Sequence, residues 1–147
     1  MLIANFLENV FEEKSFIPPG DFNLLVKALS EKTNAFSFAF DFMNDELYYF
    51  GFSKLLNEKI INNLQELSII SRDIDNLKEK LKKVKDVVVE EEINVFIGKK
   101  NPLFKTSQLS LIATRSGFNN IILGIIVSKV TDYEKHFKIF KNLINHI

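Results

Sequence analysis

The sequence predicts an α+β domain, in which strands rich in β-branched and aromatic residues are combined with amphipathic helices. Short apolar runs bounded by Gly, Pro, Asn or Asp have the length and composition of strands. They fall at residues 35–41, 46–52, 93–97, 109–114 and 121–127. Longer segments with apolar residues three and four positions apart have the period of a helix. They fall at about residues 22–32, 53–64, 71–84 and 131–145.

Length and composition set the first bounds on function. With 147 residues, 46% of them hydrophobic, the chain is long enough for one domain with its own core. Nineteen basic side chains balance nineteen acidic ones, which argues against a strong sequence-independent grip on phosphate backbones. The absence of cysteine excludes disulfides, thiolate metal sites and cysteine nucleophiles. We find no signal peptide and no apolar run of about 18 residues, so we expect a cytoplasmic protein without a membrane anchor.

Residues 1–21 are expected to form an N-terminal amphipathic helix and a linker that ends at Pro18-Pro19-Gly20. The main domain is then expected to span residues 22–147. Apolar side chains recur on one side of the first helix, and glutamates lie on the other. The apolar side could pack on its own domain or pair with a second subunit. In the second case, Phe6 and Val10 would lie at the centre of the dimer seam.

The segment 35–41 carries Phe at every second position, and the turn signal Asn44-Asp45 separates it from the next strand. We therefore predict a hairpin with a Phe-lined core face. An aromatic platform for nucleic-acid bases is disfavoured, because such platforms are interleaved with basic residues. This segment has none before Lys54. Ser53 is expected to cap the helix that follows.

Lysines are dense near the middle of the chain, at positions 78, 80, 82, 83 and 85. Glu79 and the run Glu90-Glu91-Glu92 offset their charge. We interpret the lysines as the solvated face of a helix, and a binding patch is the alternative. The apolar side of that helix would hold Leu77, Leu81 and Val84. In the same way, the last predicted helix would carry one apolar stripe of Phe137, Phe140, Ile144 and Ile147.

Five short motifs follow one another along the chain. They are Gly51-Phe52-Ser53-Lys54-Leu55-Leu56, Ile97-Gly98 with Asn101, Leu109-Ser110-Leu111-Ile112, Gly124-Ile125-Ile126 and Asp132-Tyr133. In this order and spacing the chain resembles the C-terminal regulatory domain of the HrcA-type heat-inducible transcription repressors. The similarity covers roughly residues 22–147. The residues that carry it are Gly51, Ser53, Leu55, Leu56, Ile97, Gly98, Asn101, Ser110, Gly124, Asp132 and Tyr133.

The resemblance implies a GAF-like fold, an antiparallel sheet of about five strands flanked by helices. Two segments depart from the family pattern. Lys99-Lys100 stands where the family has a glutamate pair, and Val127-Ser128-Lys129-Val130-Thr131 stands where it has Gly-Pro-Thr-Arg-Met. The turn at 43–45 is too short for the dimerisation subdomain that the family carries near this place. The first 21 residues are too short for a winged-helix DNA-binding domain, so we expect no direct DNA binding from this chain alone.

We find no arrangement of residues that would support catalysis. His136 and His146 are ten residues apart on one predicted helix, so they cannot share a metal as an i, i+4 pair can. Asp132 and His136 do have that spacing, which we interpret as a surface or helix-capping interaction. Gly98 and Gly124 lack the spacing of a phosphate-binding loop. We therefore expect no enzyme activity, no metal and no cofactor.

The resemblance implies negative regulation of heat-shock or stress genes through dimerisation and protein contacts. We expect a homodimer, with chaperonin or a DNA-binding repressor as candidate partners. The alternative is a GAF-like small-ligand sensor, with a pocket between the sheet and the segment 51–70 that the Phe-rich hairpin would line. The sequence leaves open whether the chain is complete or a fragment of, or companion to, a longer repressor.

Overall fold

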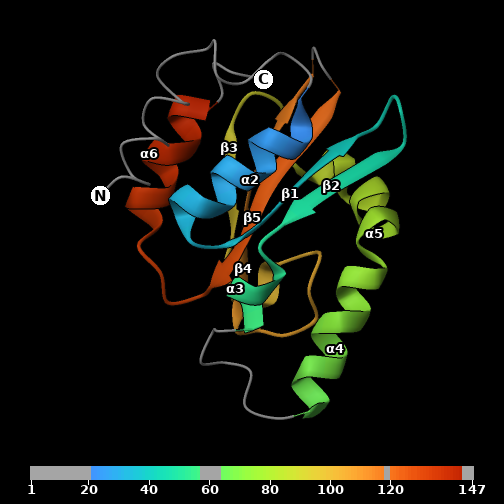
Figure 1. Cartoon of the computed structure of the whole chain (residues 1–147), viewed down its shortest axis with the longest axis vertical. Coiled ribbons are helices and arrows are strands. Elements are labelled where there is room, and N and C mark those ends of the chain that lie inside the picture. The colour runs from blue at the N-terminus through green and yellow to red at the C-terminus, as the bar shows by residue number, and fades with distance from the viewer. Residues whose placement is uncertain (1–20, 57–63, 118–119, 144–147) are drawn as a thin grey trace.

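In the computed structural model, residues 21–56, 64–117 and 120–143 are described. Within these ranges, five antiparallel strands form one sheet in the order β2-β1-β5-β4-β3 (Figure 1). The predicted α+β class with about five antiparallel strands is confirmed. The strands are β1 (Phe36–Asp41), β2 (Glu46–Phe50), β3 (Ile93–Phe96), β4 (Leu109–Ser116) and β5 (Ile121–Ser128).

Helices flank this sheet, and short 3-10 turns join them to the strands. They are α2 (Phe22–Thr33), α3 (Phe52–Leu56), α4 (Leu64–Asp75), α5 (Leu77–Val84), η2 (Lys85–Val87), η3 (Gly98–Lys100) and α6 (Tyr133–Leu143). The carboxylate of Asp21 caps α2 by accepting a hydrogen bond from the Leu24 amide at 3.1 Å. The helix ends at Asn34, whose left-handed backbone (φ 52°) lets the chain turn directly into β1.

The three central strands β1, β4 and β5 are buried on both faces, whereas the edge strands β2 and β3 are partly exposed. Side chains along a strand point alternately to either side, so each face of the sheet has its own core. The face covered by α2 and α6 holds Leu25, Val26, Leu29, Ile112, Leu123, Ile125, Phe140 and Leu143. The face covered by α3, α4, α5 and the loop before β4 holds Phe36, Phe38, Phe40, Leu55, Ile70, Leu77, Leu81, Leu103, Leu111 and Ile122. The domain therefore has three layers, with the sheet in the middle.

The predicted Phe-lined hairpin is confirmed, because Phe36, Phe38 and Phe40 are all fully buried in the core. Phe38 lies opposite Gly124 on the neighbouring strand β5. A Cβ atom placed on Gly124 would lie 2.5 Å from Cζ of Phe38 and 3.1 Å from the carbonyl oxygen of Ile112. The glycine of this motif therefore provides the space that the phenylalanine ring fills.

Two helix boundaries differ from prediction. A single helix is predicted over residues 71–84, but α4 extends back to Leu64 and the chain breaks at Asn76 before α5. The Asn76 side chain donates to the Arg72 carbonyl at 2.9 Å, and such local bonds compete with a continuous helix. Ser53, predicted as a helix cap, lies inside α3, where Gly51 accepts the first turn's hydrogen bond from Lys54.

The apolar stripe of α6 also differs from prediction. Phe140 is buried as expected, but Phe137 is 44% exposed. The buried side of the helix consists of His136, Ile139, Phe140 and Leu143. These four residues are spaced three or four positions apart, so they share one face of the helix. Phe137 follows His136 directly and therefore lies beside that face. The predicted N-terminal helix with Phe6 and Val10, the linker at Pro18-Pro19-Gly20, and the C-terminal residues Ile144, His146 and Ile147 lie outside the described residues.

Among the described residues, no helix has the length and apolarity of a membrane span.

We predict that Gly124→Ala lowers the free energy of unfolding by about 1–3 kcal/mol, because the added methyl group overpacks the site against the Phe38 ring. Urea denaturation monitored by circular dichroism measures this change. Gly117→Ala is the matched control, since the three atoms nearest to its new methyl group all belong to the flexible carboxylate of Glu90. Equal stability of the two variants would show that the Phe38 contact does not constrain position 124.

Candidate functional site

Three motif residues meet where β3 ends and β4 begins. The Gly98 amide donates to Oγ of Ser110 at 3.0 Å. Oγ of Ser110 lies 3.0 Å from the Tyr133 hydroxyl, which donates its own proton to the Lys129 carbonyl at 2.6 Å. Because the tyrosine proton is used in that bond, the Ser110 hydroxyl donates to Tyr133. This chain of hydrogen bonds, here called the Ser110 brace, ties β3, β4 and the start of α6 together.

A fourth motif residue, Asn101, holds the loop that follows. Its Oδ1 accepts hydrogen bonds from the amides of Leu103 and Phe104 at 2.9 and 3.3 Å. Its amide nitrogen donates to the Leu109 carbonyl at 3.4 Å. The side chain is buried, with 7% exposed. Asparagine is suited to this position because one side chain supplies both an acceptor and donors.

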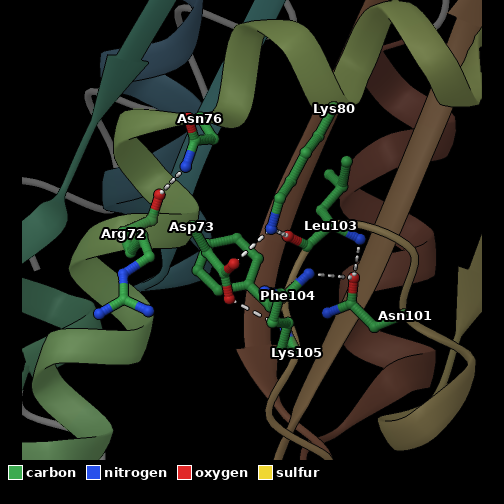
Figure 2. A network of polar contacts seen from close by, with 8 residues as sticks. All are labelled: Arg72, Asp73, Asn76, Lys80, Asn101, Leu103, Phe104 and Lys105. Carbon is green, nitrogen blue, oxygen red and sulfur yellow. Dashed lines mark hydrogen bonds and ion pairs between the residues drawn. The ribbon is translucent and has the colours of Figure 1, made fainter.

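The same loop is also fixed from the opposite side by a buried carboxylate (Figure 2). Asp73 of α4 is 2% exposed and pairs with the ammonium group of Lys80 on α5. Its second oxygen accepts from the Lys105 amide at 2.9 Å. Lys80 in turn donates to the Leu103 carbonyl at 2.9 Å. The pair therefore joins α4 and α5 to the loop that Asn101 shapes.

This network was not predicted, and it corrects the interpretation of one lysine. Lys80 was assigned to a solvated helix face, but only 23% of its side chain is exposed and its charge is used internally. A signal was present in the sequence. Asp73 stands three residues after Ile70 and four before Leu77, both of which are buried. A carboxylate at that position on an apolar stripe requires a partner, and Lys80 lies two helical turns further on.

The remaining motif residues lie elsewhere in the fold. Gly51 has a left-handed backbone (φ 89°), and a Cβ there would overlap Oγ of Ser30. Leu55 is buried in the core, whereas Leu56 and Ile97 are 40% and 51% exposed. Ser53 lies within α3 and Gly124 within β5. The motif residues therefore do not converge on one pocket. They hold separate junctions of the fold.

The start of α6 contains the expected Asp132 cap and a buried histidine. Oδ1 of Asp132 accepts from the Lys135 amide at 3.1 Å, so Asp132 caps the helix as expected, but its partner is this amide and not His136. His136 is 5% exposed, and its Nε2 lies 3.0 Å from Oγ1 of Thr131. Its Nδ1 has no partner among the described residues. Burial, and secondarily the nearby Lys135 charge, lowers the pKa of His136 below its usual 6.5, although Asp132 opposes the shift.

Among the described residues, no three His, Asp or Glu side chains are arranged to hold a metal ion. Asp73 and Lys80 are instead used in the buried ion pair, and Asp132 in the helix cap.

The fold and these braces define an α+β domain whose motif residues fix loops and helix ends. The family described as "HrcA protein C terminal domain" matches residues 4–136, which is most of the chain. The chain therefore belongs to the HrcA C-terminal domain family, and it is a regulatory domain related to the heat-shock repressors.

Two further comparisons were made. A search of the curated proteins found no match. Among solved structures, the chain is similar to one titled "Crystal structure of a hypothetical protein at 2.2 A resolution", with 24% identity and a TM-score of 0.49. The similarity covers 68% of this chain and 31% of that one, so the chain spans about a third of the length of that protein.

We predict that Asp73→Asn lowers the free energy of unfolding by about 2–3 kcal/mol, because the largely buried Lys80 ammonium group loses its counter-charge. Urea denaturation provides the measurement. Lys82→Met on the same helix is the control. It removes only exposed ion pairs with Asp45 and Glu79, which contribute about 0–1 kcal/mol. A loss no larger than that of the control would mean that Asp73 does not stabilise the loop.

We predict that His136 makes the protein less stable in mild acid. The folded state holds this imidazole neutral, so the unfolded state binds the proton more readily. Stability is retained above about pH 6.5 and falls as the pH decreases through the lowered pKa of the folded state. Thermal melts from about pH 7 to about pH 5 measure the effect, which should be smaller in His136→Gln because glutamine does not titrate. Parallel pH profiles for the two proteins would contradict the assignment.

Proposed function

We propose that this chain is a non-enzymatic regulatory domain that contributes to repression of heat-shock or stress genes through dimerisation and protein contacts. The observation that carries the proposal is the family match over residues 4–136. The placement of the motif residues supports it. Gly98, Asn101 and Ser110 stabilise the loop between β3 and β4 from within, as expected in a domain that presents a fixed surface to other proteins.

The alternative proposal is a GAF-like sensor with a ligand between the Phe-rich hairpin and the segment 51–70. The packing favours the interaction domain over this alternative. Phe36, Phe38 and Phe40 have no exposed surface and belong to one cluster with Leu55 and Ile70. In the described part of that segment, side chains therefore occupy the space between it and the hairpin. A thermal-shift screen against nucleotides and metabolites tests the sensor, because a ligand that binds only the folded state raises the melting temperature.

We propose a homodimer whose seam includes Phe6 and Val10. The support is the sequence pattern, in which apolar residues between Leu2 and Phe11 recur on one side of a predicted helix. Chaperonin and a DNA-binding repressor are the proposed partners. The equal numbers of basic and acidic side chains support contacts with protein over direct binding of DNA by this chain.

We predict that replacing both Phe6 and Val10 by Ala shifts the protein from dimer towards monomer. The reason is that residues at the centre of an interface carry most of its binding energy. Light scattering coupled to size exclusion measures the mass at several concentrations. The control Glu8→Ala with Glu12→Ala changes the polar side of the same predicted helix and should leave the mass unchanged. An unaltered dimer in the Phe6 and Val10 variant would place the seam elsewhere.

The chaperonin proposal is tested separately by the same method. The purified protein mixed with the host's chaperonin should elute partly in the chaperonin peak. A protein that remains entirely in its own peak would remove chaperonin from the proposed partners and leave the dimer proposal unaffected.

A further inference from the structure

The two segments that depart from the family pattern lie side by side in the fold. Lys99 and Lys100 belong to η3, directly after the left-handed Gly98. Lys129 follows β5, and its Cδ lies 4.0 Å from the position of a Cβ on Gly98. The Ser110 brace holds the Lys129 carbonyl, and the Lys129 amide donates to the Gln108 carbonyl at 2.8 Å. Residues about 30 positions apart in the sequence thus form one basic surface.

Exposed apolar side chains adjoin these lysines. Ile97 and Val130, their sequence neighbours, are 51% and 83% exposed. Val95 is on the same side of β3 as Ile97, because alternate residues of a strand share a face. On that side α6 contacts β3 (Figure 1), and Phe137 of α6 is 44% exposed. We call this set the β3–α6 surface; it consists of Val95, Ile97, Val130 and Phe137 with Lys99, Lys100 and Lys129.

The charges of this surface have no internal partner within the described ranges. Lys78, Lys80 and Lys82 are all paired with carboxylates of the domain. Among the described residues, no carboxylate pairs with the three lysines of the β3–α6 surface. Asp132, the acidic residue next along the chain from Val130, uses one carboxylate oxygen to cap α6.

The sheet edge itself is partly open at this surface. β3 is the last strand in the sheet order, so one side of its backbone has no neighbouring strand in the described part of the chain. The Asn94 side chain bonds to both the amide and the carbonyl of Val89, which covers the beginning of β3. Further along, the Ile97 carbonyl accepts from the Lys100 amide at 3.2 Å, so the edge without a neighbouring strand is at Val95 and Phe96. An extended segment placed along such an edge presents alternate side chains to the sheet face.

We propose that the β3–α6 surface binds an acidic segment of a partner protein that also carries aliphatic side chains. The aliphatic groups would pack on Ile97, Val95 and Phe137, and the carboxylates would pair with Lys99, Lys100 and Lys129. The inference rests on the proposed function only in that the domain acts through protein contacts. It does not depend on the Phe6 and Val10 seam or on chaperonin.

Charge and composition select this occupant over two others. A second copy of the chain, related by a twofold axis at this surface, would bring two sets of three lysines into one interface, where their like charges repel. A single-stranded nucleic acid binds through several aromatic side chains spaced along a basic surface, whereas Phe137 is the one aromatic residue in the described β3–α6 surface and the residues next to the lysines, Ile97 and Val130, are aliphatic. An acidic protein segment satisfies both the charge and the apolar groups.

The test uses a fluorescein-labelled peptide of alternating acidic and aliphatic residues, titrated with the full chain and followed by fluorescence anisotropy. We expect saturable binding that weakens as salt increases from about 50 to about 500 mM, because exposed ion pairs are screened. Changing Lys99, Lys100 and Lys129 together to Glu should weaken binding at least about tenfold. Ile97→Ser should weaken it by a smaller factor at every salt concentration. Lys138→Glu with Lys141→Glu, on exposed positions of α6, is the matched control and should have little effect.

Three outcomes would overturn the proposal. The first is no binding of the acidic peptide at millimolar protein. The second is a peptide with lysines in place of its acidic residues that binds as tightly as the acidic peptide. The third is a fluorescein-labelled oligothymidine that binds as tightly as the acidic peptide, which would show a surface for polyanions in general. Circular dichroism and melting temperature of each variant show whether it is folded. The light-scattering measurements of dimer and chaperonin use none of these seven residues, so failure of the peptide test is distinguishable from failure of the proposed function.

Discussion

Burial of the central strands on both faces is the constraint on which the rest of this structure depends. Every residue of β1 is buried, and so is every residue of β5 except Ser128. Each large apolar side chain moved from water into such a core contributes about 1.5–3 kcal/mol. A strand buried on both sides needs a layer on each face, so the helices must divide between them. This requirement places α2 and α6 on one face and α3, α4 and α5 on the other.

The same constraint determines where polar groups lie inside the domain. A hydroxyl or carboxylate that loses water must find a partner within the protein. The Ser37 hydroxyl donates to the Val26 carbonyl at 2.5 Å, and the Ser30 hydroxyl donates to the Ala35 carbonyl at 2.6 Å. Both bonds tie α2 to the beginning of β1. Asp73 and Ser110 do the same near the other edge of the sheet, where they hold the loop between β3 and β4. Interior polar groups thus join elements that apolar contacts alone would leave free to slide.

Local patterns were sufficient to predict the strands and the Phe-lined face. Phe36, Phe38 and Phe40 alternate with small or polar residues, and a period of two is typical of a strand with one face in the core. The break at Asn76 was missed because it depends on one side chain that bonds to the preceding turn. The exposure of Phe137 was missed because an apolar residue at the margin of a helix stripe is compatible with either side.

The site was less predictable than the fold, because its contacts join distant parts of the chain. The family resemblance pointed to Gly98, Ser110 and Tyr133 as members of separate motifs. The sequence pattern does not predict that these three residues form one chain of hydrogen bonds. The Asp73 and Lys80 pair spans two helices, and its remaining contacts reach a loop more than 20 residues away. Residue type and helical position indicated that Asp73 required a partner. The identity of the loop that completes the network required the structure.

The residues that match the family and those that depart from it have different places in the fold. Gly98, Asn101 and Ser110 match and are buried, where each holds a backbone junction that a substitution would disturb. Lys99 and Lys100 depart and are exposed, in the same turn. Replacement of an interior brace alters the shape of the loop, whereas replacement of an exposed side chain alters only the charge that the loop presents. A shared scaffold and a changed surface are therefore compatible within a few consecutive residues. Because positive charge favours an acidic partner and repels a basic one, the lysine pair gives this loop a partner preference opposite to that of a glutamate pair.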